Sequence, residues 1–181
     1  MDIQELETGR VTVLAIKGRI DSSNAIELGN KLRALYATPG RRVLLDLQEI
    51  DYISSAGFRT FLIALRRAAE EINQAAAPII IAGGGVDWAR AEEELRELAE
   101  LLRAPFATTP SHKGLVSEEH PLSLGALGFG AFPFANSLCL ESDLVLAVGA
   151  TFSEALTLGY GNKVIPEGAK IVQVDSDPSE I

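Results

Sequence analysis

Cysteine, histidine and long apolar runs are scarce in this chain of 181 residues, and each scarcity excludes a class of protein. The single cysteine, Cys139, can form neither an internal disulfide nor a cysteine-based zinc site. No apolar run approaches the ~18 residues of a membrane-spanning helix, and residues 1–9 are polar and acidic, unlike a signal peptide. Acidic residues outnumber basic ones by 25 to 16, which argues against a nucleic acid or an anionic membrane as partner. We therefore expect a soluble, cytoplasmic protein.

Charge divides the chain into two parts. Residues 1–75 hold ten acidic and ten basic residues, whereas residues 76–181 hold 15 acidic and six basic ones. The composition changes near Ala75–Ala77. We predict a boundary there between two sequences of different origin, with domains at 1–75 and 76–181.

The first part is predicted to alternate strands and helices. β-Branched alternation predicts a strand at Val11–Ile16, with Ile3–Glu7 as an edge strand beside it. Asp21–Asn24 is a run of capping residues before an apolar helical stripe, which predicts a helix that ends before Pro39. A buried strand is expected at Val43–Leu47.

The second part continues the alternation. The apolar run Pro78–Ala82 is typical of a parallel strand covered on both faces. Gly83–Gly85 is expected to lead into one long helix at Trp88–Arg103, and residues 110–130 are expected to be irregular. The other predicted elements are strands at Pro105–Thr109, Leu144–Val148 and Lys170–Asp175 and a short helix at Pro133–Leu140. The alternation predicts an α/β fold with a mostly parallel sheet and helices on both faces.

A second helix of the first part begins at Ser54–Gly57 and has one apolar face. That face comprises Phe58, Phe61, Leu62, Leu65, Ala69 and Ile72. Two serines at a helix start allow two interpretations. Ser55 caps the helix by accepting a hydrogen bond from a free N–H, or it is a phosphorylation site at the positive end of the helix dipole. From the residues alone we favour the cap.

Four segments follow one another in a characteristic order: Gly18–Asp21, Asp21–Asn24, Val43–Leu47 and Ile53–Phe58. This order resembles the STAS fold of anti-sigma-factor antagonists over about residues 5–72. In that family a kinase-type anti-sigma factor phosphorylates a serine in an Asp-Ser-Ser/Thr-Gly motif, and only the unphosphorylated form binds its partner. Ser55 falls on that serine, so the resemblance implies a phosphorylation switch at Ser55. It also implies an anti-sigma factor, or another protein, bound through the Ser54–Gly57 surface.

The sequence departs from this pattern at three places. Ser54 stands where the motif has aspartate, and Ala56 stands where it has a second hydroxyl residue. The last strand–helix unit of a STAS domain is absent as a recognisable STAS sequence.

The turn Gly83–Gly85 joins a buried strand to a helix, and the N–H groups of such a turn can hold a phosphate. The dinucleotide fingerprint is incomplete, because Trp88 stands at its third glycine. A purely structural turn is one interpretation. The other is a nucleotide site for FAD or ADP, with its phosphates at Gly83, Gly84 and Gly85 and a ribose hydroxyl at Asp175 or Asp177. The charge of Asp87 opposes phosphate binding at this turn.

Five blocks of the second part are collinear with a second family: Pro78–Val86, Ala104–Leu115, Glu119–Gly125, Ser142–Gly149 and Ile171–Ile181. They resemble the central domain of thiamine-diphosphate enzymes of the acetolactate synthase and decarboxylase superfamily, over about residues 73–181. The resemblance implies Rossmann-like strands, joined through a helix to the STAS-like strands. It implies a domain that holds FAD in some members and is structural in many. Thiamine diphosphate itself is held by two other domains that the sequence does not encode. We therefore expect a non-catalytic chain that does not bind thiamine diphosphate alone.

The remaining reactive side chains predict no site. His112 and His120 lack the spacing of metal ligands, so no metal is expected. There is no Gly-x-Ser-x-Gly elbow for a serine nucleophile. Cys139 is expected to be a small core residue.

Several alternatives stay open. We interpret the chain as a recombined or designed chimera, and a shortened natural fusion is the alternative. The leading function is a non-catalytic interaction module. The alternatives are an FAD- or ADP-binding module, an antagonist switched at Ser55, and a thiamine-dependent enzyme completed by partner chains. Either Val43–Leu47 or Leu144–Val148 could pair with Pro78–Ala82, and this choice decides between one sheet and two lobes.

Overall fold

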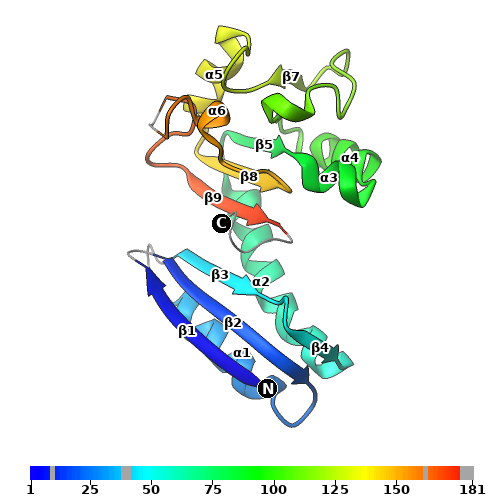
Figure 1. Ribbon diagram of the computed structural model, residues 1–181, viewed down its shortest axis with the longest axis vertical. Helices are drawn as coiled ribbons and strands as arrows, with labels where there is room; N and C mark the ends of the chain where they lie inside the picture. The colour runs from blue at the N-terminus through cyan, green and yellow to red at the C-terminus, as the bar shows by residue number, and fades with distance from the viewer. Residues whose placement is uncertain (9–10, 38–41, 161–162, 176–181) are drawn as a thin grey trace. The chain divides into compact units, whose positions relative to one another are not determined.

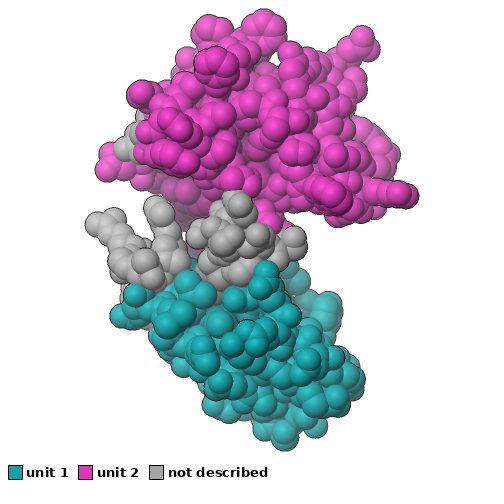
Figure 2. All heavy atoms as spheres, viewed as in Figure 1, with its two compact units in different colours: residues 1–70 teal, residues 71–181 magenta. Residues whose placement is uncertain are grey.

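The computed structural model of the chain describes residues 1–8, 11–37, 42–160 and 163–175. It divides into two compact units, Met1–Glu70 and Glu71–Ile181 (Figures 1 and 2). The boundary falls within helix α2 (Ser55–Gln74), a few residues before the change in composition. None of the helices in the described ranges combines the length and the apolarity needed to cross a membrane.

The first unit is built around one long strand. Its elements are β1 (Asp2–Thr8), β2 (Val11–Ile20), α1 (Ala25–Tyr36), β3 (Arg42–Asp46), β4 (Ile50–Ile53) and the first part of α2. Strand β2 pairs antiparallel with β1 and parallel with β3, and the sheet order is β1–β2–β3. Strand β4 pairs in parallel with the C-terminal end of β2.

The core of this unit lies on one face of its sheet. Leu14, Ile16 and Ile20 of β2 are fully buried, while the residues between them keep part of their surface exposed. This period of two is what a strand shows when only one face of its sheet is covered. The helices contribute the other buried residues of the cluster, which are Ala25, Leu28, Leu32, Leu35 and Phe61.

The second unit contains a wholly parallel sheet in the order β7–β6–β5–β8–β9. Its strands are β5 (Pro78–Ala82), β6 (Phe106–Thr108), β7 (Ser123–Ala126), β8 (Leu144–Val148) and β9 (Lys170–Val174). Its helices are α3 (Gly84–Ala89), α4 (Glu92–Leu102), α5 (Pro133–Leu140) and α6 (Glu154–Thr157), with the 3₁₀ helix η1 (Pro110–His112). The expected α/β fold with a mostly parallel sheet is confirmed.

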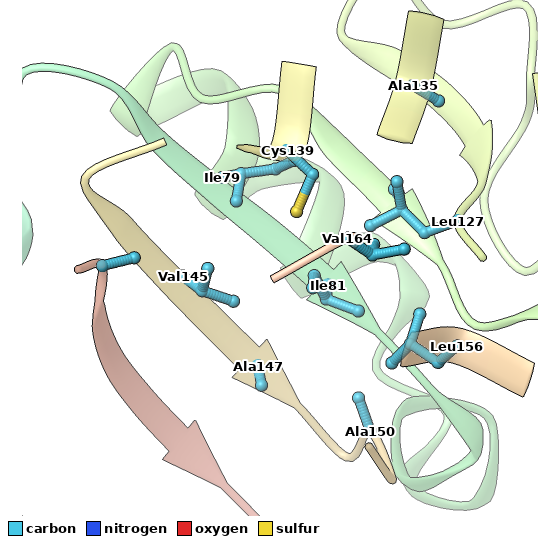
Figure 3. Close-up of a cluster of buried hydrophobic side chains, with 12 residues drawn as sticks. Ile79, Ile81, Leu127, Ala135, Cys139, Val145, Ala147, Ala150, Leu156 and Val164 are labelled. Atoms are coloured by element: carbon cyan, nitrogen blue, oxygen red, sulfur yellow. The ribbon is translucent and has the colours of Figure 1, made fainter. Parts of the chain in front are cut away.

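Helices cover both faces of this second sheet. Ile79 and Ile81 of β5 point to a cluster that includes Cys139 of α5 and Leu156 of α6 (Figure 3). Ile80 faces the opposite cluster, built with α3, α4 and the end of α2. Because both faces are covered, β5 and β8 are apolar without interruption.

The pairing of β5 settles the alternative that the sequence left open. β5 lies between β6 and β8, so Leu144–Val148 is its neighbour, and Val43–Leu47 is not. Strand β3 pairs with β2 inside the first unit. The described strands therefore form two separate sheets.

Two expectations about the second unit were wrong. One helix at Trp88–Arg103 was expected, but α3 and α4 are separate, because Arg90 ends α3 in the left-handed conformation with φ of 54°. The segment 110–130 is not wholly irregular, since it contains η1 and β7. β7 has the sequence Ser-Leu-Gly-Ala and lacks β-branched residues, so its own sequence does not predict a strand.

Candidate functional site

The serines at the start of α2 have different roles. The Gly57 N–H donates to Ser54 Oγ at 3.1 Å, so Ser54 caps the helix. Ser55 is the first helical residue, and it is exposed. The interpretation of Ser55 as the cap was therefore wrong by one residue.

The same turn is held tightly against β2. Ser54 N–H donates to the Ile20 carbonyl at 2.8 Å. A Cβ added to Gly57 would lie 2.6 Å from Ile20 Cγ2, so the close approach of α2 to β2 requires glycine here. The Ser54–Gly57 surface is thus a fixed feature of the first unit.

Exposed apolar side chains lie on β4 before this turn and along α2 after it. Phe58, Leu62 and Leu65 of α2 are 57%, 38% and 59% exposed. Tyr52 and Ile53 of β4 are also exposed, and the Arg19 guanidinium lies 4.2 Å from the centre of the Tyr52 ring. On the apolar face expected for α2, only Phe61 is buried within the first unit. The sequence contains a signal of this exposure. The run 61–65 is apolar throughout, which is more than a single stripe facing the core requires.

The glycine turn lies at the carboxyl end of β5, beside the end of β8. Gly83 N–H donates to the Val148 carbonyl at 3.0 Å, and Gly85 N–H donates to the Gly149 carbonyl at 2.9 Å. Both amides that flank Gly84 are thus engaged within the protein. A phosphate at this turn would have to displace or share these hydrogen bonds.

Sterics give the turn a structural role. A Cβ on Gly83 would lie 2.3 Å from the Gly149 carbonyl oxygen, and a Cβ on Gly85 would lie 2.6 Å from Gly149 Cα. At Gly84 the nearest atoms belong to the His112 ring, at 2.7 Å. Two of the three glycines are therefore needed for close backbone packing against Gly149, the residue that follows β8.

The two candidate ribose ligands are placed unequally. Asp175 directly follows β9, and Val174 accepts a hydrogen bond from Gly149 N–H at 2.7 Å, so Asp175 lies at the same carboxyl edge as the glycine turn. Asp177 lies outside the described residues. The nucleotide site stays a prediction.

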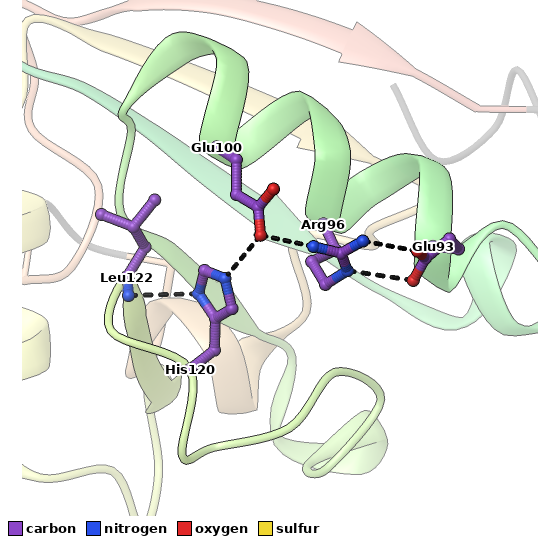
Figure 4. Close-up of polar contacts among 5 residues, drawn as sticks. All are labelled: Glu93, Arg96, Glu100, His120 and Leu122. Carbon is purple, nitrogen blue, oxygen red and sulfur yellow. Dashed lines mark hydrogen bonds and ion pairs between the residues drawn. The ribbon is translucent and has the colours of Figure 1, made fainter.

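The two histidines make separate contacts. His112 Nδ1 lies 3.2 Å from Thr109 Oγ1 and 3.1 Å from Ser111 Oγ. His120 Nδ1 accepts from Leu122 N–H at 3.2 Å, so its Nε2 carries the hydrogen that faces Glu100 Oε1 at 3.2 Å (Figure 4). In the described ranges, no three His, Cys, Asp or Glu side chains converge on a possible metal site.

Charged residues of α4 complete the network around His120 (Figure 4). Arg96 pairs with Glu93 and Glu100, and its hydrogen bond lowers the pKa of Glu93. The hydrogen bond from His120, and then that from Arg96, lowers the pKa of Glu100. The network fixes the segment before β7 to α4 and holds its carboxylates charged.

The lone thiol lies in the core. Cys139 has no exposed surface, and burial raises its pKa to about 12. It packs in the cluster between α5 and the second sheet (Figure 3). The expectation of a small core residue is confirmed.

Two family models match the chain. Residues 65–181 match the family described as "Thiamine pyrophosphate enzyme, central domain", and residues 3–78 match the family described as "Mlab, STAS domain". The two-part resemblance that the sequence indicated is confirmed.

Curated relatives match the second part. The probable acetolactate synthase large subunit of Methanococcus aeolicus is 43% identical over 117 residues, which are 65% of this chain and 19% of the relative. That of Methanocaldococcus jannaschii is 41% identical over 119 residues, which are 66% of this chain and 20% of the relative. The chain thus spans about a fifth of the length of these relatives.

A solved structure is similar in fold. It is an X-ray structure from Mycobacterium smegmatis, described as that of a thiamin diphosphate-dependent enzyme. The TM-score is 0.54 at 21% identity, and the match covers 92% of this chain and 34% of the other.

Proposed function

We propose a binding function, not a catalytic one, for this chain, which belongs to the family of thiamine pyrophosphate enzyme central domains and carries a STAS-type segment before that domain. One observation carries the proposal: Phe58, Leu62 and Leu65 are exposed together on α2. We call these three residues the α2 ridge. Large apolar side chains grouped on a surface mark sites where another protein binds.

The spacing of the α2 ridge indicates the shape of the partner. Phe58, Leu62 and Leu65 follow one another at intervals of four and three residues. Such intervals align side chains along one side of a helix and are the pattern by which two helices pack together. Ser55 lies three residues before Phe58, on the same side. The ridge therefore suits a helical partner that reaches the start of α2.

Charge indicates the chemistry of that partner. Arg59 and Arg66 are exposed beside the α2 ridge. Within Ser55–Glu70, three arginines stand against one glutamate, although the whole chain carries a net charge of −9. Complementary charge favours an amphipathic helix with acidic residues along its apolar stripe. Through the STAS resemblance, an anti-sigma factor is one candidate for such a partner.

The exposure of Ser55 favours a second function, a phosphorylation switch. Because Ser54 supplies the cap, the Ser55 hydroxyl is not needed to form the helix. A phosphate there would add a charge of roughly −2 at the end of the α2 ridge. It would repel an acidic partner, so we propose that the unphosphorylated form binds.

The state of the reactive side chains supports a non-catalytic chain. Cys139 is buried, and His120 is engaged with Glu100 and Leu122. Thiamine diphosphate requires a cation at its diphosphate, and in the described part of the chain no three His, Cys, Asp or Glu side chains lie together. This supports the proposal that the chain alone does not hold that cofactor.

A labelled helical peptide tests the binding function. The probe carries leucines at intervals of three and four and glutamates elsewhere, and binding is followed by fluorescence anisotropy. The wild-type chain should bind, and Leu65→Asp and Ser55→Asp should each weaken binding at least about tenfold. Ile26→Asp on α1 is the matched control, because Ile26 is 72% exposed and lies off the α2 ridge. Equal binding by wild type and Leu65→Asp would refute the proposal.

An activity assay tests the non-catalytic part. The purified chain is incubated with thiamine diphosphate, magnesium and pyruvate, and substrate consumption is compared with a buffer blank. No consumption is expected. Turnover that survives repurification of the chain would contradict the proposal.

A further inference from the structure

A cavity of about 280 Å³ lies at the amino end of the second sheet, where β5 begins. Its walls come from the end of α2, the start of β5 and the end of α4, and they include Ile72, Asn73, Pro78, Leu101 and Arg103. We call it the amino-edge cavity. The glycine turn at 83–85 lies at the opposite, carboxyl end of β5, so the two places are separate.

Two helices end at the amino-edge cavity, and each leaves a backbone carbonyl there without an N–H from the described backbone. In a continued helix the Leu101 carbonyl would accept from residue 105, but Pro105 has no N–H. The Asn73 carbonyl would accept from Ala77, but that N–H donates to Asp143 at 2.9 Å. Such carbonyls form the negative end of a helix dipole. This side of the cavity therefore suits a positively charged hydrogen-bond donor.

Arg103 gives the amino-edge cavity a group of the opposite kind. Among the described residues that line the cavity, only Arg103 is charged. Arg96 of the same helix pairs with two glutamates, whereas Arg103 forms no ion pair with a described carboxylate. A guanidinium presents five N–H donors in a fork that matches a carboxylate. Arg103 therefore suits a carboxylate that comes from outside the chain.

The remaining wall of the amino-edge cavity is apolar. Ile72 and Leu102 pack against the cluster that covers one face of the second sheet, and they present the rest of their surface to the cavity. Leu101 is 80% exposed, although leucine is normally buried. An aliphatic group in the cavity would remove part of this surface from water, which is favourable.

One class of small molecule has a positive donor, a carboxylate and an aliphatic group together. We propose that the amino-edge cavity binds an α-amino acid with an aliphatic side chain. Its ammonium group donates to the carbonyls of Asn73 and Leu101, its carboxylate accepts from Arg103, and its side chain lies on the apolar wall. The site is in the second unit and does not depend on the binding function proposed for the α2 ridge.

The volume of the cavity limits the size of this ligand. About 280 Å³ is the space of roughly nine water molecules, at about 30 Å³ each. An amino acid with about nine non-hydrogen atoms therefore fits. A ligand with so few atoms binds weakly, so we expect a Kd on the order of 1 mM.

Three matched molecules test the proposal. L-Norleucine is the probe, hexanoate is the same molecule without its amine, and pentylamine is the same molecule without its carboxylate. Each is titrated to about 100 mM into ¹⁵N-labelled chain, a range that brackets a millimolar Kd. Norleucine should shift the amide signals of the residues that line the cavity. Hexanoate and pentylamine should each bind at least about tenfold more weakly.

Arg103→Gly tests the carboxylate contact without disturbing the fold. Arg103 ends α4 with φ of 51°, a left-handed conformation that favours glycine. The variant should bind norleucine at least about tenfold more weakly and should bind pentylamine like the wild type. Arg90→Gly is the matched control. It removes the same charge from the same kind of helix end, with φ of 54°, and Arg90 does not line the cavity. It should bind norleucine like the wild type.

Four results would overturn the proposal. The first is the absence of shifts at the cavity residues over the whole range of norleucine. The second is hexanoate that binds as tightly as norleucine, which would make the cavity a site for simple anions. The third is pentylamine that binds as tightly as norleucine, which would leave Arg103 without a role. The fourth is equal binding of norleucine by the wild type and Arg103→Gly.

Discussion

The two sheets of this chain bury their strands differently, and the difference shows what the sequence of a strand records. In β2 of the first unit, buried and partly exposed residues alternate, because helices cover one face only. In β5 and β8 of the second unit, almost every residue is buried, because helices cover both faces. The alternation of a strand thus reports how many faces of its sheet are covered.

The largest expected effect is on the alkylation rate of Cys139, the one thiol of the chain. Cys139 lies in the second unit, and burial raises its pKa from an ordinary value of 9.0 to about 12. At a fixed pH near 8, the thiolate fraction should be about a thousandfold lower than in the unfolded chain. Alkylation of native protein, followed by mass spectrometry, should thus be slower than that of urea-unfolded protein by about two orders of magnitude or more. Labelling of native chain at the unfolded rate would show that the core around α5 is open.

A glycine substitution should destabilise the second unit strongly. In Gly83→Ala the new Cβ meets the Gly149 carbonyl oxygen and Ala150 Cα, which are backbone atoms and cannot rotate away. We expect a loss of about 3 kcal/mol or more in the free energy of unfolding, with faster labelling of Cys139. Urea unfolding followed through Cys139 labelling measures it.

Gly84→Ala is the control for that substitution. The three atoms nearest to its Cβ would all belong to the ring of His112, a side chain that can turn aside. The loss should be much smaller than for Gly83→Ala. Equal losses at the two positions would mean that the packing of β5 against β8 does not depend on the absence of a side chain at Gly83.

The fold could be predicted from the sequence wherever a segment carries its own pattern. The apolar runs at β5 and β8 and the alternation in β2 are local signals, and they predicted strands correctly. β7 has no such signal, because its four residues are ordered by pairing with β6. The break between α3 and α4 was missed for a similar reason. It depends on the left-handed backbone of Arg90, a residue type with no preference for that conformation.

The candidate sites likewise have features that the local sequence predicts and features that depend on the tertiary structure. The turn at Ser54–Gly57 and the glycines at 83–85 stand out in sequence because their residue types are unusual there. Which serine caps the helix depends on one residue of register, which composition does not carry. The role of Gly83 and Gly85 depends on Gly149, more than sixty residues away, which only the tertiary structure brings close. Exposure of the α2 ridge depends equally on what the rest of the chain leaves uncovered.

A smaller effect on the free energy of unfolding tests which serine caps α2 in the first unit. Ser54→Ala removes the side chain that accepts Gly57 N–H, so it should lower the free energy of unfolding by about 0.5–2 kcal/mol. Ser55→Ala should change it by much less, because the Ser55 hydroxyl is exposed and does not cap α2. Hydrogen exchange at the first turns of α2 measures both. Greater exchange in Ser55→Ala than in Ser54→Ala would return the cap to Ser55.

The smallest effect is expected at an exposed carboxylate of the second unit, where it depends on pH. Asp143 accepts N–H groups from Ala76 at 2.7 Å and Ala77 at 2.9 Å, and these hydrogen bonds lower its pKa below the ordinary value of 3.8. Because the folded pKa is below the unfolded one, the stabilisation is complete above the unfolded value and is lost as pH falls through the folded value. Wild type should exceed Asp143→Asn in urea midpoint at pH 7, and the difference should shrink below about pH 4. Glu141→Gln, which removes a neighbouring exposed charge, is the control. A difference between wild type and Asp143→Asn that stays constant down to about pH 2 would show that the charge of Asp143 is not what holds the segment before β5.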